Sequence, residues 1–240
     1  DADGNVSKLS KRHGATGFYD LIDEGYLPEA IINYIALLGW CPKDNQEIFT
    51  LKELEKAFDI SGISKSPAVF DYDKLSWFNG EYIKAMTPEK FTEVAMPYYK
   101  KVFGDKQMPY EKFAAILQKR TTQLTQIPEM LDFFAELPSY TKELFVNKKS
   151  KTNLENSPVV LKEAYDRLKA MPEWNETSIH DCLINMAVEK ELKNGTVMWP
   201  VRIAAAGKTV TPGGAVEILD ILGRDESPAR LEKGMAILAE

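Results

Sequence analysis

Residues 27–39 read LPEAIINYIALLG, and this stretch decides the class of fold. The proline at its second position suits the first turn of a helix, because the N–H that proline lacks would have no helical acceptor there. Apolar side chains then recur at helical spacing, at Leu27, Ala30, Ile31, Tyr34 and Leu38. Gly39 stands where a helix end is expected. The stretch therefore predicts an amphipathic helix that ends at Gly39.

Similar helix signals recur along the chain. Thr50 and Glu53 form a capping box ahead of LKELEKAF. A hydroxyl residue followed by proline marks three further helix starts, at Thr87-Pro88, Ser157-Pro158 and Ser227-Pro228. Further helices are expected near residues 73–86, 109–122, 128–136, 177–193 and 214–222. No run of residues alternates as a paired strand would, so the chain is predicted to be mainly α-helical.

Length and composition limit the class of protein. The chain has 240 residues, 44% of them hydrophobic and 28% charged, which is typical of a folded chain and not of a disordered one. Lys and Arg number 30 against 36 Asp and Glu, so the net charge of −6 requires any nucleic-acid contact to come from local patches. No apolar stretch approaches the roughly 18 residues of a membrane span. We therefore expect a cytoplasmic protein without membrane contact.

Cysteine and histidine usage argues against a metal site. The chain has two residues of each type, Cys41 and Cys182 with His13 and His180, and their spacing fits no zinc motif. We expect no structural metal. Both thiols are interpreted as buried structural groups.

Changes in composition suggest how the chain is organised. The polar stretch 147–157, NKKSKTNLENS, lacks an apolar period and indicates a linker or an exposed loop. Residues 60–70 form the best irregular connector, and a second boundary is placed at residue 84. The first residue is Asp1, and a strongly basic loop follows within a dozen residues, which suggests a piece of a longer protein. The predicted regions are 1–84, 85–147 and 148–240.

The basic loop is the most informative short segment. Lys8, Lys11 and Arg12 place three cationic side chains within five residues, around the small hydroxyl of Ser10. Such a loop can converge on one oligophosphate when it folds over it. Taken alone, the same residues are equally well explained as a solvated basic loop near a chain end.

The text around this loop resembles a specific family. KLSKRHGA looks like the KMSKS loop of class I aminoacyl-tRNA synthetases, in the form used by bacterial-type glutamyl-tRNA synthetases. The resemblance continues in order through EGYLPEAIINYIALLGW, EIFTLKEL, VFDYDKLSWFNGEYI and WPVRIAAAGK, followed by TPGG and ILDILG. It implies the KMSKS loop and a helical stem-contact region over residues 1–84, then two helical anticodon-binding subdomains over 85–147 and 148–240. Nothing in the sequence matches the family's HIGH motif or its Rossmann domain.

The resemblance implies a glutamate–tRNA ligase, which activates glutamate with ATP and Mg and transfers it to tRNA(Glu). Lys8 and Lys11 match the two lysines of the motif and are the implied catalytic residues, and Ser10 and Arg12 complete the ATP-binding loop. Leu9 replaces the motif's methionine. Because loop lysines act on substrates that another domain must hold, we expect the 240 residues alone to be inactive. The implied partners are tRNA(Glu), ATP and glutamate, and we expect a monomer.

Three residues match family positions that contact the anticodon. Arg120, in ILQKRTTQLTQIPE, matches the position that reads the third base, where guanidinium donors suit the acceptors of cytosine and oppose the donors of guanine. Arg202 and Thr211 match positions that touch anticodon nucleotides. Plainer explanations stand beside these. Arg120 also fits a solvated helix-end cation, and Arg202 an exposed helix arginine without a partner.

Aromatic residues are further candidates, because unpaired bases stack on aromatic planes. Core packing is the favoured explanation for Trp77 and Phe78, which share a helical segment with Leu75 and Ile83. The full set of candidates is Trp40, Trp77, Phe78, Trp174 and Trp199.

Other function classes remain open. Composition and periodicity alone also fit a stand-alone helical module that binds RNA or protein and has no ligase role. Glutaminyl-tRNA synthetases share the KMSKS region but carry β-barrel anticodon domains, for which strand sequence is lacking here. The truncated tRNA-modifying relatives lack an anticodon domain altogether. A basic face and a steep salt dependence would distinguish an RNA binder from a protein-binding module.

Overall fold

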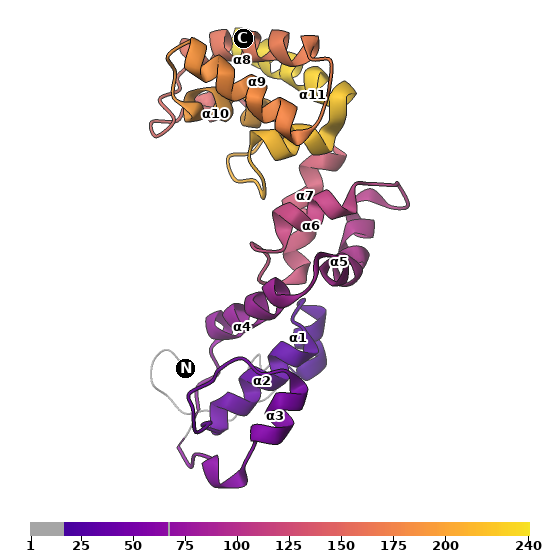
Figure 1. The fold of residues 1–240 in the computed structure, drawn as a ribbon, viewed down its shortest axis with the longest axis vertical. Helices are drawn as coiled ribbons and strands as arrows, with labels where there is room; N and C mark the ends of the chain where they lie inside the picture. The colour runs from indigo at the N-terminus through magenta and orange to yellow at the C-terminus, as the bar shows by residue number, and fades with distance from the viewer. Residues whose placement is uncertain (1–16, 67) are drawn as a thin grey trace. The chain divides into compact units, whose positions relative to one another are not determined.

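The structure, a computed structural model, describes residues 17–66 and 68–240. The basic loop with Lys8, Ser10, Lys11 and Arg12 lies outside the described residues, as does His13. Within them the regular structure is helical (Figure 1), and the β pairing found there is limited to two isolated bridges, Trp40–Ile63 and Asn147–Thr152. The mainly α-helical fold predicted from the sequence is confirmed. No helix in this part of the chain is long and apolar enough to cross a membrane.

The α-helices follow one another along the whole described chain. In order they are α1 (Phe18–Asp23), α2 (Pro28–Gly39), α3 (Leu51–Ala57), α4 (Tyr72–Ala85), α5 (Pro88–Phe103), α6 (Tyr110–Leu117), α7 (Ile127–Ala135), α8 (Asn156–Ala170), α9 (Glu176–Glu189), α10 (Asn194–Ala206) and α11 (Ala215–Ala239). Short 3₁₀ helices lie at η2 (Ile60–Gly62), η3 (Leu124–Gln126) and η4 (Lys142–Phe145).

The chain forms two compact units. Unit 1 comprises the described residues up to Tyr98 together with Gln118–Ile127, and unit 2 comprises Tyr99–Leu117 and Pro128–Glu240. The boundaries predicted near residues 84 and 147 fall inside unit 1 and unit 2 respectively. The division into three regions stays a prediction.

Unit 1 has its core between α2 and α4. Tyr34 and Phe78 are almost fully buried there, with ring centroids 5.7 Å apart, and the Tyr34 hydroxyl accepts a hydrogen bond from the Asp71 backbone N–H at 2.6 Å. Phe78 is thus a core residue, as predicted. For Trp77 the prediction was wrong, because this neighbour on the same helix turns outward and is 44% exposed. Cys41 is also exposed, so its reading as a buried thiol was wrong, whereas Cys182 is half-buried.

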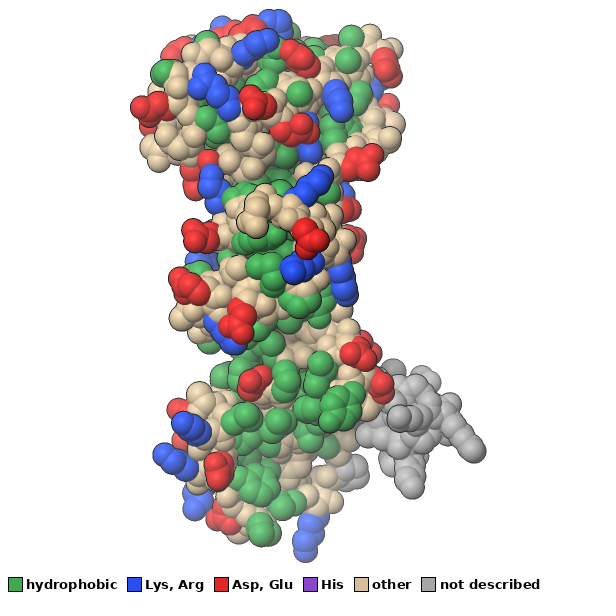
Figure 2. Space-filling model, turned by 90° about the vertical axis from the view of Figure 1, so that its right-hand side faces the viewer, with side chains coloured by type: hydrophobic (Ala, Val, Ile, Leu, Met, Phe, Trp, Pro, Cys, Tyr) green, Lys and Arg blue, Asp and Glu red, His purple; other side chains and the backbone are tan. Residues whose placement is uncertain are grey.

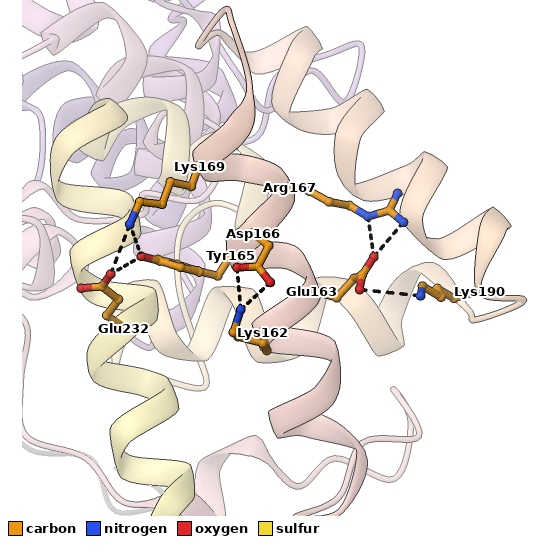
Figure 3. Close-up of polar contacts among 8 residues, drawn as sticks. All are labelled: Lys162, Glu163, Tyr165, Asp166, Arg167, Lys169, Lys190 and Glu232. Carbon is orange, nitrogen blue, oxygen red and sulfur yellow. Dashed lines mark hydrogen bonds and ion pairs between the residues drawn. The ribbon is translucent and has the colours of Figure 1, made fainter.

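Unit 2 is built around α8, α10 and α11, with α9 packed against them. Gly234 allows α11 to approach α10 closely, since a Cβ atom there would lie 2.6 Å from the Ala204 Cβ. On the outer side of α8, Glu163 lies between Arg167 at 2.8 Å and Lys190 at 3.6 Å (Figure 3). Tyr165 contacts Glu232 of α11, so polar contacts join α8 to both neighbours.

A buried arginine ties two helix ends together in unit 2. Arg230 is 2% exposed, and its Nη1 donates to the carbonyl oxygens of Phe133 at 2.6 Å and Ala205 at 2.9 Å. These carbonyls belong to the last turns of α7 and α10, which lack helical donors and need such partners. Arg230 thereby fixes the end of α10, on which one candidate site depends.

Two of the four predicted helix starts are confirmed together with their caps. The Thr50–Glu53 capping box forms with both bonds, at 3.2 and 2.7 Å, and the Thr87 hydroxyl accepts from the Lys90 N–H at 3.2 Å. The helix over Pro28–Gly39 is also confirmed.

Helices also begin near the other two predicted starts, at Asn156 for α8 and after Gly223 within α11, but the two serines do not cap them because both face the interior. Asn153 supplies the acceptor for the first turn of α8, and the buried hydroxyl of Ser157 lies 3.5 Å from the Phe145 carbonyl oxygen. In α11 the helix restarts after Gly223, whose φ is +82°, and the buried Ser227 hydroxyl donates to the Leu219 carbonyl oxygen at 3.0 Å. A buried hydroxyl must find an acceptor, and in both places a nearby carbonyl provides it.

Candidate nucleic-acid interface

The first candidate site lies where α10 ends in unit 2. Gly207 closes the helix with φ +64°, and its N–H donates to the Ile203 carbonyl oxygen at 2.7 Å. A Cβ atom there would lie 2.9 Å from both Pro138 Cγ and Tyr140 Cδ1, so both conformation and space require glycine. Lys208 then binds Asp132 of α7 at 2.6 Å. The loop that follows α10 is therefore held at its first two residues.

Arg202 lies on α10 and interacts with this loop. Its Nη2 donates to the Thr209 carbonyl oxygen at 3.0 Å and its Nη1 to the Thr211 hydroxyl at 3.2 Å. The guanidinium also lies over the Trp199 ring, 4.7 Å from its centroid. The reading as an exposed arginine without a partner is therefore wrong. Burial lowers the pKa of Arg202, yet a guanidinium stays charged at any physiological pH.

Thr211 shapes the loop. It is 9% exposed, and its hydroxyl donates to the Gly213 carbonyl oxygen at 2.8 Å while accepting from Arg202. The sequence predicted Arg202 and Thr211 as two separate nucleotide contacts, and the structure brings them into direct contact. Arg202 has more N–H donors than these two bonds use, and the others have no partner among the described residues. This arrangement can present a fixed guanidinium to an acceptor-rich ligand.

The aromatic candidates have structural roles in the described chain. Trp199 donates its indole N–H to the Leu144 carbonyl oxygen at 2.9 Å, and its ring carries Arg202. Trp174 donates to the Leu219 carbonyl oxygen at 3.2 Å, and Trp40 is buried against Phe49. Trp77 is the one member of the set with a large exposed fraction.

The second candidate site lies in unit 1 and contains Arg120. The helix predicted over 109–122 ends at Leu117, and residues 118–120 form a turn. Arg120 and Lys119 are both exposed there, and Arg120 makes no hydrogen bond or ion pair with any described residue. The side chain is thus available to a ligand. Arg120 belongs to unit 1 and Arg202 to unit 2.

Exposed lysines near the start of α10 add positive charge to unit 2. The turn that contains Ser150 packs against this start, where the Thr196 hydroxyl donates to the Ser150 carbonyl oxygen at 2.8 Å. Lysines without an ion pair among the described residues lie on that turn and before the helix, at Lys148, Lys149, Lys151 and Lys193. On the face drawn in Figure 2, basic and acidic side chains are interspersed. That face carries no extended basic surface.

No metal site is found in the part of the chain that the structure describes. Within residues 17–66 and 68–240, no group of three or more His, Cys, Asp or Glu side chains is placed to hold a metal ion.

Comparison with known proteins gives consistent matches along the chain. The family described as anticodon binding domain matches residues 90–235, and the catalytic domain of class I tRNA synthetases (E and Q) matches residues 3–77. A glutamate–tRNA ligase from Clostridium kluyveri is 50% identical over 228 residues, which are 95% of this chain and 47% of that protein. One from Clostridium novyi is 46% identical over 237 residues, 98% of this chain and 49% of that protein.

Solved structures agree with these matches. A glutamate tRNA ligase from Elizabethkingia meningosepticum, solved in complex with its amino acid, superimposes with a TM-score of 0.80 at 28% identity, over 98% of this chain and 49% of that one. The glutamate-tRNA synthetase from Elizabethkingia anophelis gives 0.79 at 26% identity, over 97% and 48%. The chain spans about half the length of the curated relatives it matches. It belongs to the anticodon-binding domain family, and the resemblance to glutamyl-tRNA synthetases indicated by its sequence is confirmed.

Proposed function

We propose that this chain is the tRNA-binding part of a glutamate–tRNA ligase that acts in the cytoplasm as a monomer. Its partner is tRNA(Glu), and the complete enzyme would join glutamate to that tRNA at the expense of ATP with Mg. The observation that carries the proposal is the Arg202 site, in which Trp199 and the 208–214 loop hold a charged guanidinium in one orientation. Such groups recognise single-stranded nucleotides through their phosphates and base edges.

In the same proposal, Arg120 reads the third anticodon base. Its guanidinium offers only donors, which suit the O2 and N3 acceptors of cytosine. A guanine at that position presents its own N1–H and N2–H, so donors would face donors. The exposure of Arg120 and the lack of a partner among described residues support this role.

The basic loop supplies the chemical step in the complete enzyme. We assign Lys8 and Lys11 to stabilising the charge that builds on the departing pyrophosphate, with Ser10 and Arg12 completing the ATP contacts. A stabilising group acts only on substrates held in line with it. The purified 240-residue chain should therefore show no ATP–pyrophosphate exchange.

Binding of tRNA(Glu) to the chain tests the proposal. Replacing Arg202 by Ala should weaken binding by about 1–3 kcal/mol, because the fixed guanidinium is lost. Arg224 provides a matched control, because its guanidinium also makes two hydrogen bonds within unit 2, in this case to the carbonyl oxygens of Pro172 and Met171. Arg224→Ala should leave the affinity unchanged. Equal losses in both variants, or no tRNA binding by the wild type, would count against the proposal and favour a protein-binding module.

A further inference from the structure

The segment that carries Arg120 is held on unit 1 by backbone contacts. After α6 the chain leaves unit 2 and runs along unit 1 from Gln118 to Ile127. The Leu124 N–H donates to the Gly25 carbonyl oxygen at 3.0 Å, and the Thr125 hydroxyl donates to the Glu24 carbonyl oxygen at 2.7 Å. A Cβ atom on Gly25 would lie 2.6 Å from the Thr125 nitrogen, so the two backbones touch.

One buried amide joins three parts of unit 1 at this contact. Asn79 of α4 is fully buried, and its Oδ1 accepts from the Leu27 N–H at 2.8 Å. Its Nδ2 donates to the carbonyl oxygens of Gly25 at 3.3 Å and Thr122 at 2.6 Å. The side chain thereby links α4, the turn between α1 and α2, and the residue two positions after Arg120.

A second amide holds the other side of the same turn. The Gln118 Nε2 donates to the carbonyl oxygens of Ile83 at 3.0 Å and Met86 at 2.7 Å. Ile83 lies in the last turn of α4 and Met86 directly follows the helix, and the Ile83 carbonyl oxygen also accepts from the Met86 N–H at 3.2 Å. Arg120 thus lies between two positions, 118 and 122, that are both fixed to α4.

We infer that Asn79 is a positioning residue for Arg120, which it fixes through Thr122 while Gln118 acts from the other side. The inference rests on the proposed function, because it explains how Arg120 could discriminate. A guanidinium on a mobile turn could withdraw from a guanine and bind another acceptor, so the unfavourable contact would be relieved. A guanidinium on a fixed turn keeps its N–H donors facing the N–H donors of guanine. The loss of binding free energy with the wrong base is then retained.

Asn33 provides a matched control. It is also a fully buried asparagine of unit 1 with three hydrogen bonds, to the Glu47 carbonyl oxygen, the Phe49 N–H and the Tyr82 hydroxyl. None of these bonds involves the turn of Arg120. Loss of either amide should destabilise unit 1 similarly, because each leaves buried backbone groups unsatisfied.

The test is the ratio of affinities of the 240-residue chain for tRNA(Glu) and tRNA(Gln), with urea unfolding of each variant. Asn79→Ala should lower this ratio by about tenfold, and Asn33→Ala should keep it at the wild-type value despite a similar loss of stability. Gln118→Ala, at a half-buried position, should lower the ratio with little effect on unfolding. If Asn79→Ala does not fold, the Gln118→Ala variant alone still tests the inference.

A double variant separates positioning from general disturbance. In an Arg120→Gln background, Asn79→Ala should cause no further loss of discrimination, since it acts through Arg120. A wild-type chain that binds both tRNAs alike would overturn the proposed role of Arg120 and this inference with it. A discriminating wild type whose Asn79→Ala and Gln118→Ala variants keep the ratio, or whose Asn33→Ala variant loses it equally, would overturn the inference alone.

Discussion

At the level of single residues, Gly207 determines the path of the loop that supplies the hydrogen-bond acceptors of Arg202. Its positive φ ends α10 and directs the chain into the loop that supplies the Thr209 and Thr211 oxygens. The left-handed conformation costs a residue with a Cβ atom about 1–2 kcal/mol, and at Gly207 that atom would also collide with Pro138 and Tyr140.

Replacing Gly207 by Ala should therefore destabilise unit 2 by about 2–4 kcal/mol, strain and overpacking together. Gly104 is the matched control, with φ +61° and nothing within 4 Å of its would-be Cβ atom. Gly104→Ala should lose only the stability that the backbone strain costs. Urea unfolding of both variants measures the difference in their free energies of unfolding. Equal losses of stability would contradict the prediction, because they would mean that Pro138 and Tyr140 move aside without destabilising the unit.

At the scale of elements, Tyr82 joins α4 to the segment before α3. Its hydroxyl donates to the Asn33 Oδ1 at 2.7 Å and also contacts the Phe49 carbonyl oxygen. Burial, with a smaller effect from Glu29, raises the pKa of Tyr82 to about 12. The folded chain thus favours the neutral phenol.

This pKa gives a prediction about alkaline pH. The stability that the neutral Tyr82 contributes is complete below about pH 10, where unfolded tyrosine titrates, and is lost as pH rises toward 12. Tyr82→Phe should therefore lose less stability than the wild type between these pH values. Tyrosinate absorbance should show that the variant lacks a group titrating near pH 12. If the variant instead lacked a tyrosine that titrates near pH 10, the raised pKa of Tyr82 would be contradicted.

The elements also show what sequence can and cannot reveal. The hydroxyls of Thr50 and Thr87 cap their helices as predicted, because each accepts a hydrogen bond from an N–H of the first turn. The hydroxyl of Ser157 is buried and donates to the Phe145 carbonyl oxygen instead. Arg202 was expected on a helix, but the bounds of α10 were not predicted, since buried residues surround this helix on most sides and leave no clear amphipathic period. The contacts of Asn79 join residues about fifty positions apart, and no local pattern carries them.

At the scale of the whole molecule, the family and the mainly α-helical class follow from the ordered motifs. The partners of Arg202 do not, because they depend on how the 208–214 loop folds back on α10. Only the spacing of Trp199 and Arg202, three residues apart on one helix, offered a signal that the two side chains meet. The net charge of −6, with basic and acidic side chains interspersed on the face drawn in Figure 2, gives no sign of one extended basic surface there.

The proposed recognition of the tRNA(Glu) anticodon by this chain can be tested by changing a single base. The affinity of the chain is measured for tRNA(Glu) and for the same tRNA with the third anticodon base changed from C to G, at several salt concentrations. We predict that the base change costs the wild type about 1–3 kcal/mol of binding free energy and costs Arg120→Gln little, with the affinity of both falling steeply as salt rises. Equal affinity of the wild type for the two tRNAs would contradict it.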